Sequence, residues 1–245
     1  MINSLSIIFP VYNESLRLEQ SLQKIILFFN SYKKKFDELE IIFIDDGSVD
    51  NTNKMLTNFV SSVFEKKNKN IVFKIIRLDK NFGKGFALKQ GVYFAKNDWI
   101  LTLDIDLSVE LDELIIWDKL YISKKFDLYF GSRLLKKSKV KKIFFRNLLG
   151  HIFRFLTYKL FNIAALDSQC GFKLYKKKIA KKIFSMIHSN RFVHDIEIVI
   201  ISRKLGYEIS QLPVKWIHKP YGKINIFYDP FVMFFDLIRI YFHNK

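Results

Sequence analysis

Two carboxylates that are two residues apart are the side chains of this chain best placed to do chemistry. Asp104 and Asp106 follow the apolar run 99–103, and residues two apart on a strand share a face. They would present paired oxygen ligands where a buried strand leaves the core. Mg²⁺ and Mn²⁺ prefer oxygen ligands and complete their shell with water and substrate phosphates. The pair therefore predicts a metal site that serves a diphosphate, with a simple strand-end turn as the alternative.

Polar motifs follow three other apolar runs in the same way. They are Pro-Val-Tyr-Asn-Glu at 10–14, Asp-Asp-Gly-Ser at 45–48 and Asn-Phe-Gly-Lys-Gly at 81–85, and a helical pattern follows each. Repeated alternation of strand and helix predicts an α/β fold, with a mostly parallel, doubly wound sheet flanked by helices. Ligands of such sheets bind outside the carboxyl ends of the strands, where all four motifs fall.

Two of these motifs carry groups suited to a nucleotide. Asp45 and Asp46 could accept hydrogen bonds from ribose hydroxyls or from a base imide, as an acidic residue after a strand does in dinucleotide-binding folds. Lys84, between two glycines, could approach a phosphate together with backbone N–H groups. The glycine-to-lysine spacing of a Walker A loop is absent. Each motif alone is also compatible with a turn, in which Asp50 or Asn51 would cap the next helix.

The charge of the chain calls for an anionic partner. Its 245 residues include 41 Lys and Arg against 24 Asp and Glu, a formal net charge of +17 at pH 7. Nucleic acid, phospholipid and a phosphorylated substrate all fit that charge. No Pro/Gly/Ser-rich linker or repeat divides the sequence, so we expect one domain over 1–225 and a C-terminal appendage over 226–245.

Cysteine content and hydropathy favour a reducing compartment and no membrane crossing. The single cysteine, Cys170, excludes an internal disulfide, and a small buried hydrophobe is favoured over a catalytic thiol. No apolar run approaches the ~18 residues of a spanning helix. The N-terminus does not resemble a signal peptide.

Two segments predict amphipathic helices at a membrane interface. The stretch 128–166 has no Asp or Glu, and within it residues 143–162 divide into a basic, polar face and an apolar face on a helical wheel. Such a helix can lie in the interface of an anionic membrane. A core-packed helix with a solvated charged face is the alternative. A second, very apolar helix begins at residues 229–230.

Asp195 and Glu197 open another predicted helix. Side chains two apart on a helix point about 200° apart, so these two cannot act as a carboxylate pair. We expect one of them to cap the helix or to face the site. None of the five histidines has the spacing of zinc ligands, and no Ser/His/Asp set is evident.

Taken together and in their order along the chain, these motifs resemble those of the inverting family 2 glycosyltransferases of the GT-A fold. The resemblance runs from residue 5 to about 240 and includes Gly-Ser-Arg at 131–133, Asp-x-Gln-Cys-Gly-Phe-Lys at 167–173 and Pro-Val-x-Trp at 213–216. It points to the polyprenyl-phosphate branch of the family, and most of all to the dolichyl-phosphate glucosyltransferases. The ordered set of motifs is far more specific than any one of them.

The resemblance implies a role for each motif. It assigns the nucleotide sugar to Pro10, Tyr12, Glu14, Asp45, Asp46, Lys84 and Asp104. It assigns the acceptor phosphate to Arg133, Arg146 and Lys223. It assigns a Mg²⁺ or Mn²⁺ ion to Asp104 and Asp106, which with Asp195 are the implied catalytic residues. The sequence departs from the family pattern at His194 and Gly222 on the acceptor side, and it lacks the membrane-spanning segment of many relatives.

The leading hypothesis is transfer of a hexose from a nucleoside diphosphate sugar, with UDP-glucose favoured, to polyprenyl or dolichyl phosphate with inversion. The enzyme would be metal-dependent and peripheral on the cytoplasmic face of a membrane, with no nucleic-acid partner. A first rival is a soluble GT-A enzyme that glycosylates a hydroxyl of a surface glycan and uses Asp195 or Glu197 as general base. A second rival is a nucleic-acid-binding protein, but the carboxylates at the strand ends would repel the phosphates of the nucleic acid.

Overall fold

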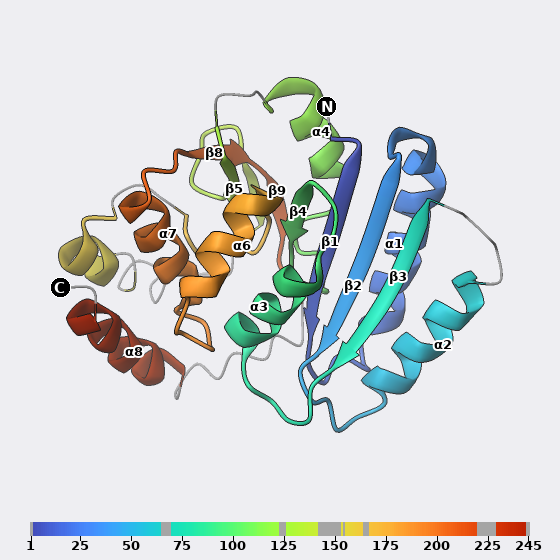
Figure 1. The fold of residues 1–245 in the computed structure, drawn as a ribbon, viewed down its shortest axis with the longest axis horizontal. Coiled ribbons are helices and arrows are strands. Elements are labelled where there is room, and N and C mark those ends of the chain that lie inside the picture. Colours follow the sequence, from blue (N-terminus) through green and yellow to red (C-terminus); the bar gives the residue numbers. More distant parts are fainter. Residues whose placement is uncertain are drawn as a thin grey trace.

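The computed structural model describes residues 2–64, 70–122, 126–141, 153, 155–163, 167–219 and 229–243. A seven-stranded sheet forms its centre (Figure 1). The strands are β1 (Ser4–Val11), β2 (Glu38–Asp45), β3 (Ile71–Arg77), β4 (Trp99–Thr102), β5 (Leu128–Ser132), β7 (Lys173–Lys176) and β8 (Ile209–Pro213). Their order across the sheet is β3-β2-β1-β4-β7-β5-β8.

The sheet is mostly parallel, as the sequence predicts. β7 runs antiparallel to both of its neighbours, β4 and β5, and the other neighbouring pairs are parallel. The antiparallel direction of β7 brings the residues that precede it to the carboxyl ends of β4 and β5. The Asp-x-Gln-Cys-Gly-Phe-Lys motif therefore reaches the same edge as the earlier motifs.

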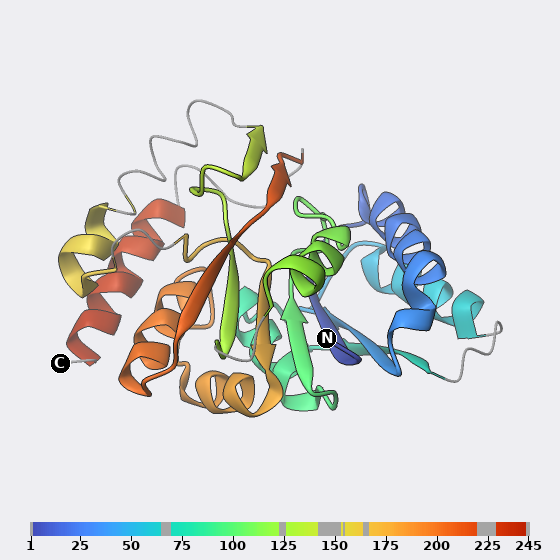
Figure 2. The same cartoon turned by 90° about the horizontal axis from the view of Figure 1, so that it is seen from above.

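Helices cover both faces of the sheet (Figure 2). One core lies beneath α1 (Leu18–Tyr32), which is followed by the short η1 (Lys33–Lys35), and beneath α2 (Thr52–Phe64) and α4 (Asp112–Leu120). The core on the other face is built with α3 (Lys84–Phe94), α6 (Lys177–Met186), α7 (His194–Lys204) and α8 (Asp229–His243). The C-terminal helix α8 thus packs on the same core as α3, α6 and α7.

Alternating side chains of the central strands pack into these two cores. On β1, Ile7 and Phe9 join the core beneath α1, whereas Ile8 joins the core beneath α3. On β2, Phe43 and Ile44 divide in the same way. Strands that are buried on both faces need apolar residues at every position, which is why they appear in the sequence as continuous apolar runs.

The segment 212–216, which the sequence suggests is one late strand, belongs to two strands in two sheets. β8 ends at Pro213, and β9 (Lys215–Ile217) pairs in parallel with β6 (Lys139–Lys141) in a small second sheet. Pro213 has no N–H to extend a ladder, and the N–H of Val214 donates to Ser138 Oγ at 3.2 Å instead. The expectation of one continuous strand was wrong because the chain leaves the main sheet at this point.

The helical part of the first predicted interface helix that the structure describes, residues 155–161, lies beside α8 at one end of the molecule (Figures 1 and 2). Residues 155–161 are helical, and the rings of Phe161 and Tyr241 have centroids 6.1 Å apart. The rest of the predicted helix, 143–152 and 154, lies outside the described residues. None of the helices described here is both long and apolar enough to cross a membrane.

Close packing of α3 on the sheet generates a test of the fold. An alanine Cβ at Gly91 would lie 2.4 Å from Ile8 Cγ2 and 3.3 Å from Ile44 Cγ1. Gly91→Ala adds helix propensity, but we expect overpacking to dominate and to lower the free energy of unfolding by about 1–2 kcal/mol in urea titrations. Tyr93→Ala, a truncation of a side chain that is exposed on the same helix, serves as control. Equal or greater stability of Gly91→Ala would contradict this packing.

Candidate active site

The loops that follow β1 and β2 are tied into one unit at the carboxyl edge of the sheet. Asn13 N–H donates to Ser48 Oγ at 2.9 Å, and Glu14 N–H donates to Thr52 Oγ1 at 2.7 Å. Asn13 adopts φ 51°, a left-handed conformation that asparagine tolerates. These bonds fix the Pro-Val-Tyr-Asn-Glu loop, with Pro10 in β1 and Tyr12 just after it, against the Asp-Asp-Gly-Ser loop.

The two neighbouring aspartates after β2 have different environments. Asp46 accepts hydrogen bonds from the backbone N–H groups of Phe82 and Gly83, each at 2.8 Å, so both of its oxygens hold the loop that carries Lys84. Asp45 Oδ1 accepts from Ser48 N–H at 2.9 Å. Its Oδ2 is buried and accepts no hydrogen bond from the described residues, although Arg77 Nε lies 3.7 Å away as an ion-pair partner. Asp45 therefore keeps an acceptor oxygen, whereas Asp46 uses both of its oxygens to hold a loop.

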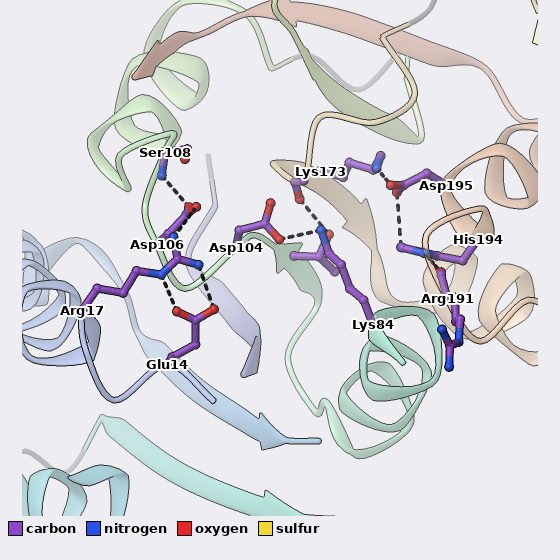
Figure 3. Close-up of polar contacts among 12 residues, drawn as sticks. Glu14, Arg17, Lys84, Asp104, Asp106, Ser108, Lys173, Arg191, His194 and Asp195 are labelled. Atoms are coloured by element: carbon purple, nitrogen blue, oxygen red, sulfur yellow. Dashed lines mark hydrogen bonds and ion pairs between the residues drawn. The ribbon is translucent and has the colours of Figure 1, made fainter. Parts of the chain in front are cut away.

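Lys84 lies beside Asp104 at the centre of the site (Figure 3). Its Nζ is 2.5 Å from Asp104 Oδ1. Burial alone would lower the pKa of Lys84, but the carboxylates of Asp104 and Asp195 outweigh burial and raise it. The lysine is therefore a permanent cation at neutral pH. A phosphate that reached this point would meet a full positive charge.

Asp106 contacts Arg17, a residue just before α1 (Figure 3). Arg17 Nη1 lies 3.4 Å from Asp106 Oδ2, and the Nε and Nη2 atoms of Arg17 both bond to the carboxylate of Glu14. Asp106 Oδ1 accepts from Ser108 N–H at 2.9 Å. Glu14 thus lies near the end of β4, with Arg17 as its link to Asp106.

Asp104 and Asp106 fit the cation that the sequence predicts. Both carboxylates lie at the end of β4, and the Asp104 side chain is 43% exposed. Within the described part of the chain, no group of three or more His, Cys, Asp or Glu side chains could hold a metal ion. Two carboxylates suit Mg²⁺ or Mn²⁺ when diphosphate oxygens and water complete the shell. They would not suit a site made of protein ligands alone.

Asp195 lies on the side of Lys84 opposite to Asp104 and forms a buried ion pair with Lys173 (Figure 3). Its Oδ1 contacts Lys173 Nζ and lies 3.3 Å from His194 Nε2. Lys173 is 1% exposed and Asp195 is 6% exposed. Burial opposes the ionised carboxylate, but His194, Lys173 and Lys84 outweigh burial and lower the pKa of Asp195. Asp195 is therefore an anion that is already engaged, which makes it a poor proton acceptor near neutrality.

Glu197 has a structural role in the same helix. Its carboxylate is buried and accepts hydrogen bonds from the backbone N–H groups of His188 and Ser189 at 3.0 and 2.8 Å. These bonds hold the turn between α6 and α7. The expectation that Asp195 and Glu197 do not form a carboxylate pair is confirmed, because they contact different partners.

Arg133 lies just after β5 in contact with Asp167. Its Nε and Nη2 atoms donate to the two oxygens of Asp167 at 2.8 and 2.7 Å. Burial alone would lower the pKa of Arg133, but Asp167 outweighs it and raises the pKa, with a further contribution from Asp104. The other two residues assigned to the acceptor phosphate, Arg146 and Lys223, lie outside the described residues.

The sequence reasoning missed three partners in this site: Arg17, Lys173 and Asp167. Lys173 and Asp167 lie in a recognised motif, but nothing in its spacing shows that one pairs with Asp195 and the other with Arg133. The available signal was a lysine at the start of the short strand Lys-Leu-Tyr-Lys at 173–176, because a lysine that becomes buried requires a counter-ion.

A family model described as Glycosyl transferase family 2 matches residues 6–184. That match covers more than half of the chain. This chain belongs to glycosyl transferase family 2. The sequence resemblance to the family is therefore confirmed.

Two curated relatives of this family 2 glycosyltransferase share a name. A dolichyl-phosphate beta-glucosyltransferase from Dictyostelium discoideum is 34% identical over 97% of this chain and 74% of its own length. A human protein of the same name is 30% identical over 96% of this chain and 74% of its own length.

Solved structures confirm the GT-A fold of this family 2 glycosyltransferase. One is glucosyl-3-phosphoglycerate synthase from Mycobacterium tuberculosis, solved with UDP, which superposes with a TM-score of 0.67 at 16% sequence identity. The match covers 99% of this chain and 80% of the synthase chain. Another is a mannosyltransferase from Pyrobaculum calidifontis, solved with GDP-Man and Mn²⁺, which superposes with a TM-score of 0.59 at 18% sequence identity. The match covers 90% of this chain and 59% of the mannosyltransferase chain. At such identities the likeness shows the fold alone.

The first prediction for the site concerns the approach of Gly171 to Asp104. An alanine Cβ at Gly171 would lie 2.5 Å from Asp104 Oδ2 and 3.0 Å from its Cγ. Because the carboxylate would have to move, we expect Gly171→Ala to weaken Mn²⁺-dependent UDP binding by about tenfold or more in calorimetry. Gly91→Ala is the matched control, since it should lower stability without changing UDP affinity. Wild-type UDP affinity in Gly171→Ala would show that Asp104 does not need this position.

The second prediction concerns the Lys173–Asp195 pair. Lys173→Met leaves a buried carboxylate without its main partner, so we expect the free energy of unfolding to fall by about 3–5 kcal/mol at pH 7. Lys176→Met is the control: it breaks the more exposed pair with Asp127 on the same strand and should cost no more than about 1 kcal/mol.

The pH dependence of that deficit follows from the sign of the pKa shift. Because folding lowers the pKa of Asp195 in the wild type, the pair contributes stability above the unfolded pKa of about 3.9 and loses it as pH falls further. In Lys173→Met the buried carboxylate binds a proton more readily. The stability difference between the two proteins should shrink as the pH falls toward 4 in urea titrations, and a constant difference would contradict the ion pair.

Proposed function

We propose that this chain transfers glucose from UDP-glucose to a dolichyl-type polyprenyl phosphate, with inversion at the anomeric carbon. Relatives named dolichyl-phosphate beta-glucosyltransferase align over most of the chain. Their name supports glucose as the transferred sugar and a lipid phosphate as the acceptor. The observation that carries the choice of a phosphate acceptor is the engagement of Asp195 by Lys173.

A phosphate acceptor needs no general base. A phosphate monoester has its second pKa near ~6, so it carries an anionic oxygen nucleophile near neutrality, whereas a hydroxyl must lose its proton as it attacks. Asp195 is held in an ion pair and Glu197 accepts two backbone hydrogen bonds, so neither is poised to take a proton. Arg133 offers directed N–H donors that an acceptor phosphate can bind. The hydroxyl-acceptor rival lacks a base in this part of the structure.

The donor would lie along the carboxyl ends of β1, β2 and β4. Asp45, with one oxygen without a hydrogen-bond partner, is the proposed acceptor for the nucleoside. Pro10, Tyr12 and Glu14 belong to the adjoining loop. Lys84 is the proposed cation for the diphosphate, and Asp104 and Asp106 are the proposed ligands of Mg²⁺ or Mn²⁺. When bound, such an ion neutralises charge on the leaving diphosphate.

The reaction is proposed as one in-line displacement. An oxygen of the lipid phosphate forms a bond to the anomeric carbon as the bond from that carbon to the diphosphate oxygen breaks. The electron pair of the broken bond leaves with UDP, and Lys84 faces that developing charge. A single displacement on the opposite face of the sugar inverts the anomeric carbon.

The lipid acceptor requires access to a membrane surface, and we place the enzyme on the cytoplasmic face as a peripheral protein. On α8, Leu237 and Ile240 are buried, whereas Phe231, Phe235 and Phe242 are each more than 60% exposed. Exposed aromatic side chains beside basic residues suit an interface. Segment 226–245 is therefore proposed as an interfacial appendage to the catalytic domain over 1–225.

Organic extraction tests the proposed reaction. Incubation with radiolabelled UDP-glucose, Mg²⁺ or Mn²⁺ and dolichyl phosphate should place label in the lipid phase. Dolichol, the same lipid with a hydroxyl in place of the phosphate, should give only background because no base activates it. Asp106→Asn should remove most of the transfer. Label on dolichol, or no label on dolichyl phosphate with any sugar of a nucleotide-sugar panel, would reject the proposal.

A further inference from the structure

Asp167 holds Arg133 by one edge of the guanidinium group. The Nε–H donates to Asp167 Oδ2 at 2.8 Å, and Nη2–H donates to Asp167 Oδ1 at 2.7 Å. The backbone N–H of Arg133 donates to the same Oδ2 at 2.8 Å. Three bonds to one carboxylate fix both the backbone and the plane of the arginine.

Other elements support the two partners from the sides. Trp216 in β9 lies with its ring centroid 5.8 Å from Arg133 Cζ, a cation–π distance. Asp167 N–H donates to Gln211 Oε1 in β8 at 3.1 Å. Asp167 is 4% exposed, so its carboxylate faces the protein and not solvent. Residues from three other segments, Asp167, Gln211 and Trp216, therefore determine how Arg133 points.

The remaining edge of the guanidinium is left for a ligand. An arginine has five N–H donors, and the Nε–Nη2 edge is used by Asp167. Within the described residues, Nη1 has no hydrogen-bond partner, and the Arg133 side chain is 27% exposed. Gly171, four residues after Asp167, lies against the Asp104 carboxylate, since a Cβ added at Gly171 would be 2.5 Å from Asp104 Oδ2. The segment that holds Arg133 therefore also reaches the aspartate at the donor side.

We infer that Asp167 is a positioning residue that aims Nη1 of Arg133 at the phosphate of the acceptor. The inference rests on the proposed function, because it assumes that the acceptor carries a phosphate. Asp167 does not touch either substrate. It holds a long, flexible side chain in one orientation before the phosphate arrives, which spares the entropy that a mobile arginine would lose on binding.

The pairing has a second consequence for specificity. Asp167 neutralises Arg133 on one edge, so the site attracts a phosphate through directed N–H bonds more than through net charge. A lysine would supply a point charge without such a fork and could not replace this arginine.

Steady-state kinetics of single and double variants test this role. Arg133→Ala, Asp167→Ala and the double variant are compared in the dolichyl phosphate assay at saturating UDP-glucose. We expect Asp167→Ala to raise the KM for dolichyl phosphate about ten- to hundredfold and to leave the KM for UDP-glucose within about twofold of wild type. The double variant should match Arg133→Ala alone, because Asp167 acts only through the arginine.

Asp127→Asn is the matched control. Asp127 pairs with Lys176 at 3.0 Å, and these residues adjoin the same strands, β5 and β7, at the ends opposite to Arg133 and Asp167. Its loss should leave both KM values unchanged. Thermal melting of all variants separates a loss of stability from a loss of arginine positioning. Only the loss of positioning changes the KM for dolichyl phosphate without changing the KM for UDP-glucose.

Chemical rescue supplies a readout that a merely structural role would not change. Added guanidinium ion should restore part of the activity of Arg133→Ala, since Asp167 still offers its carboxylate to the cation. The same ion should not restore the double variant, which lacks that carboxylate.

The outcomes separate this inference from the proposed function. Glucolipid formation by the wild type, with an unchanged KM for dolichyl phosphate in Asp167→Ala, would overturn the positioning role alone. Equal rescue of the single and double variants would overturn it as well. No glucolipid from the wild type would overturn the proposed function and this inference with it.

Discussion

Four carboxylates at the carboxyl edge of the sheet each contact a cation from another part of the chain. The pairs are Lys84–Asp104, Arg17–Asp106, Lys173–Asp195 and Arg133–Asp167. Carboxylates crowded at one edge repel each other, and partly buried charges are costly unless they are paired. Each acidic motif therefore requires a basic residue elsewhere, and these pairings hold loops that are far apart in the sequence in one arrangement.

Close backbone approach makes these pairings possible. Gly171 leaves the space that the Asp104 carboxylate occupies, and Gly85 lets the start of α3 abut the start of α7 at Ser189 and His194. The second contact brings Lys84, at the first position of α3, to the same centre as Asp195, in the first turn of α7. A side chain at either glycine would separate the residues that the charges hold together.

The arrangement separates the proposed donor side of the site from the proposed acceptor side. Asp45, Lys84, Asp104 and Asp106 gather at the ends of β1, β2 and β4, whereas Arg133 and Asp167 lie at the ends of β5 and β7. Asp195 lies in a buried ion pair with Lys173, so it stabilises the centre of the site and is not free to act as a base. Under the proposed function, this arrangement suits an acceptor that arrives already ionised.

The sequence by itself determined the fold class, the family and the edge at which the site lies. Apolar runs followed by polar motifs are visible in one dimension, because a strand buried on both faces must be apolar throughout and its functional residues must follow its end. The tertiary structure alone decided which charges meet. Asp46 was indistinguishable from Asp45 until its two oxygens were found on the N–H groups of Phe82 and Gly83. Asp195 changed from a possible base to the partner of Lys173 because β7 and α7 pack together, and such long-range pairing leaves no trace in local spacing or periodicity.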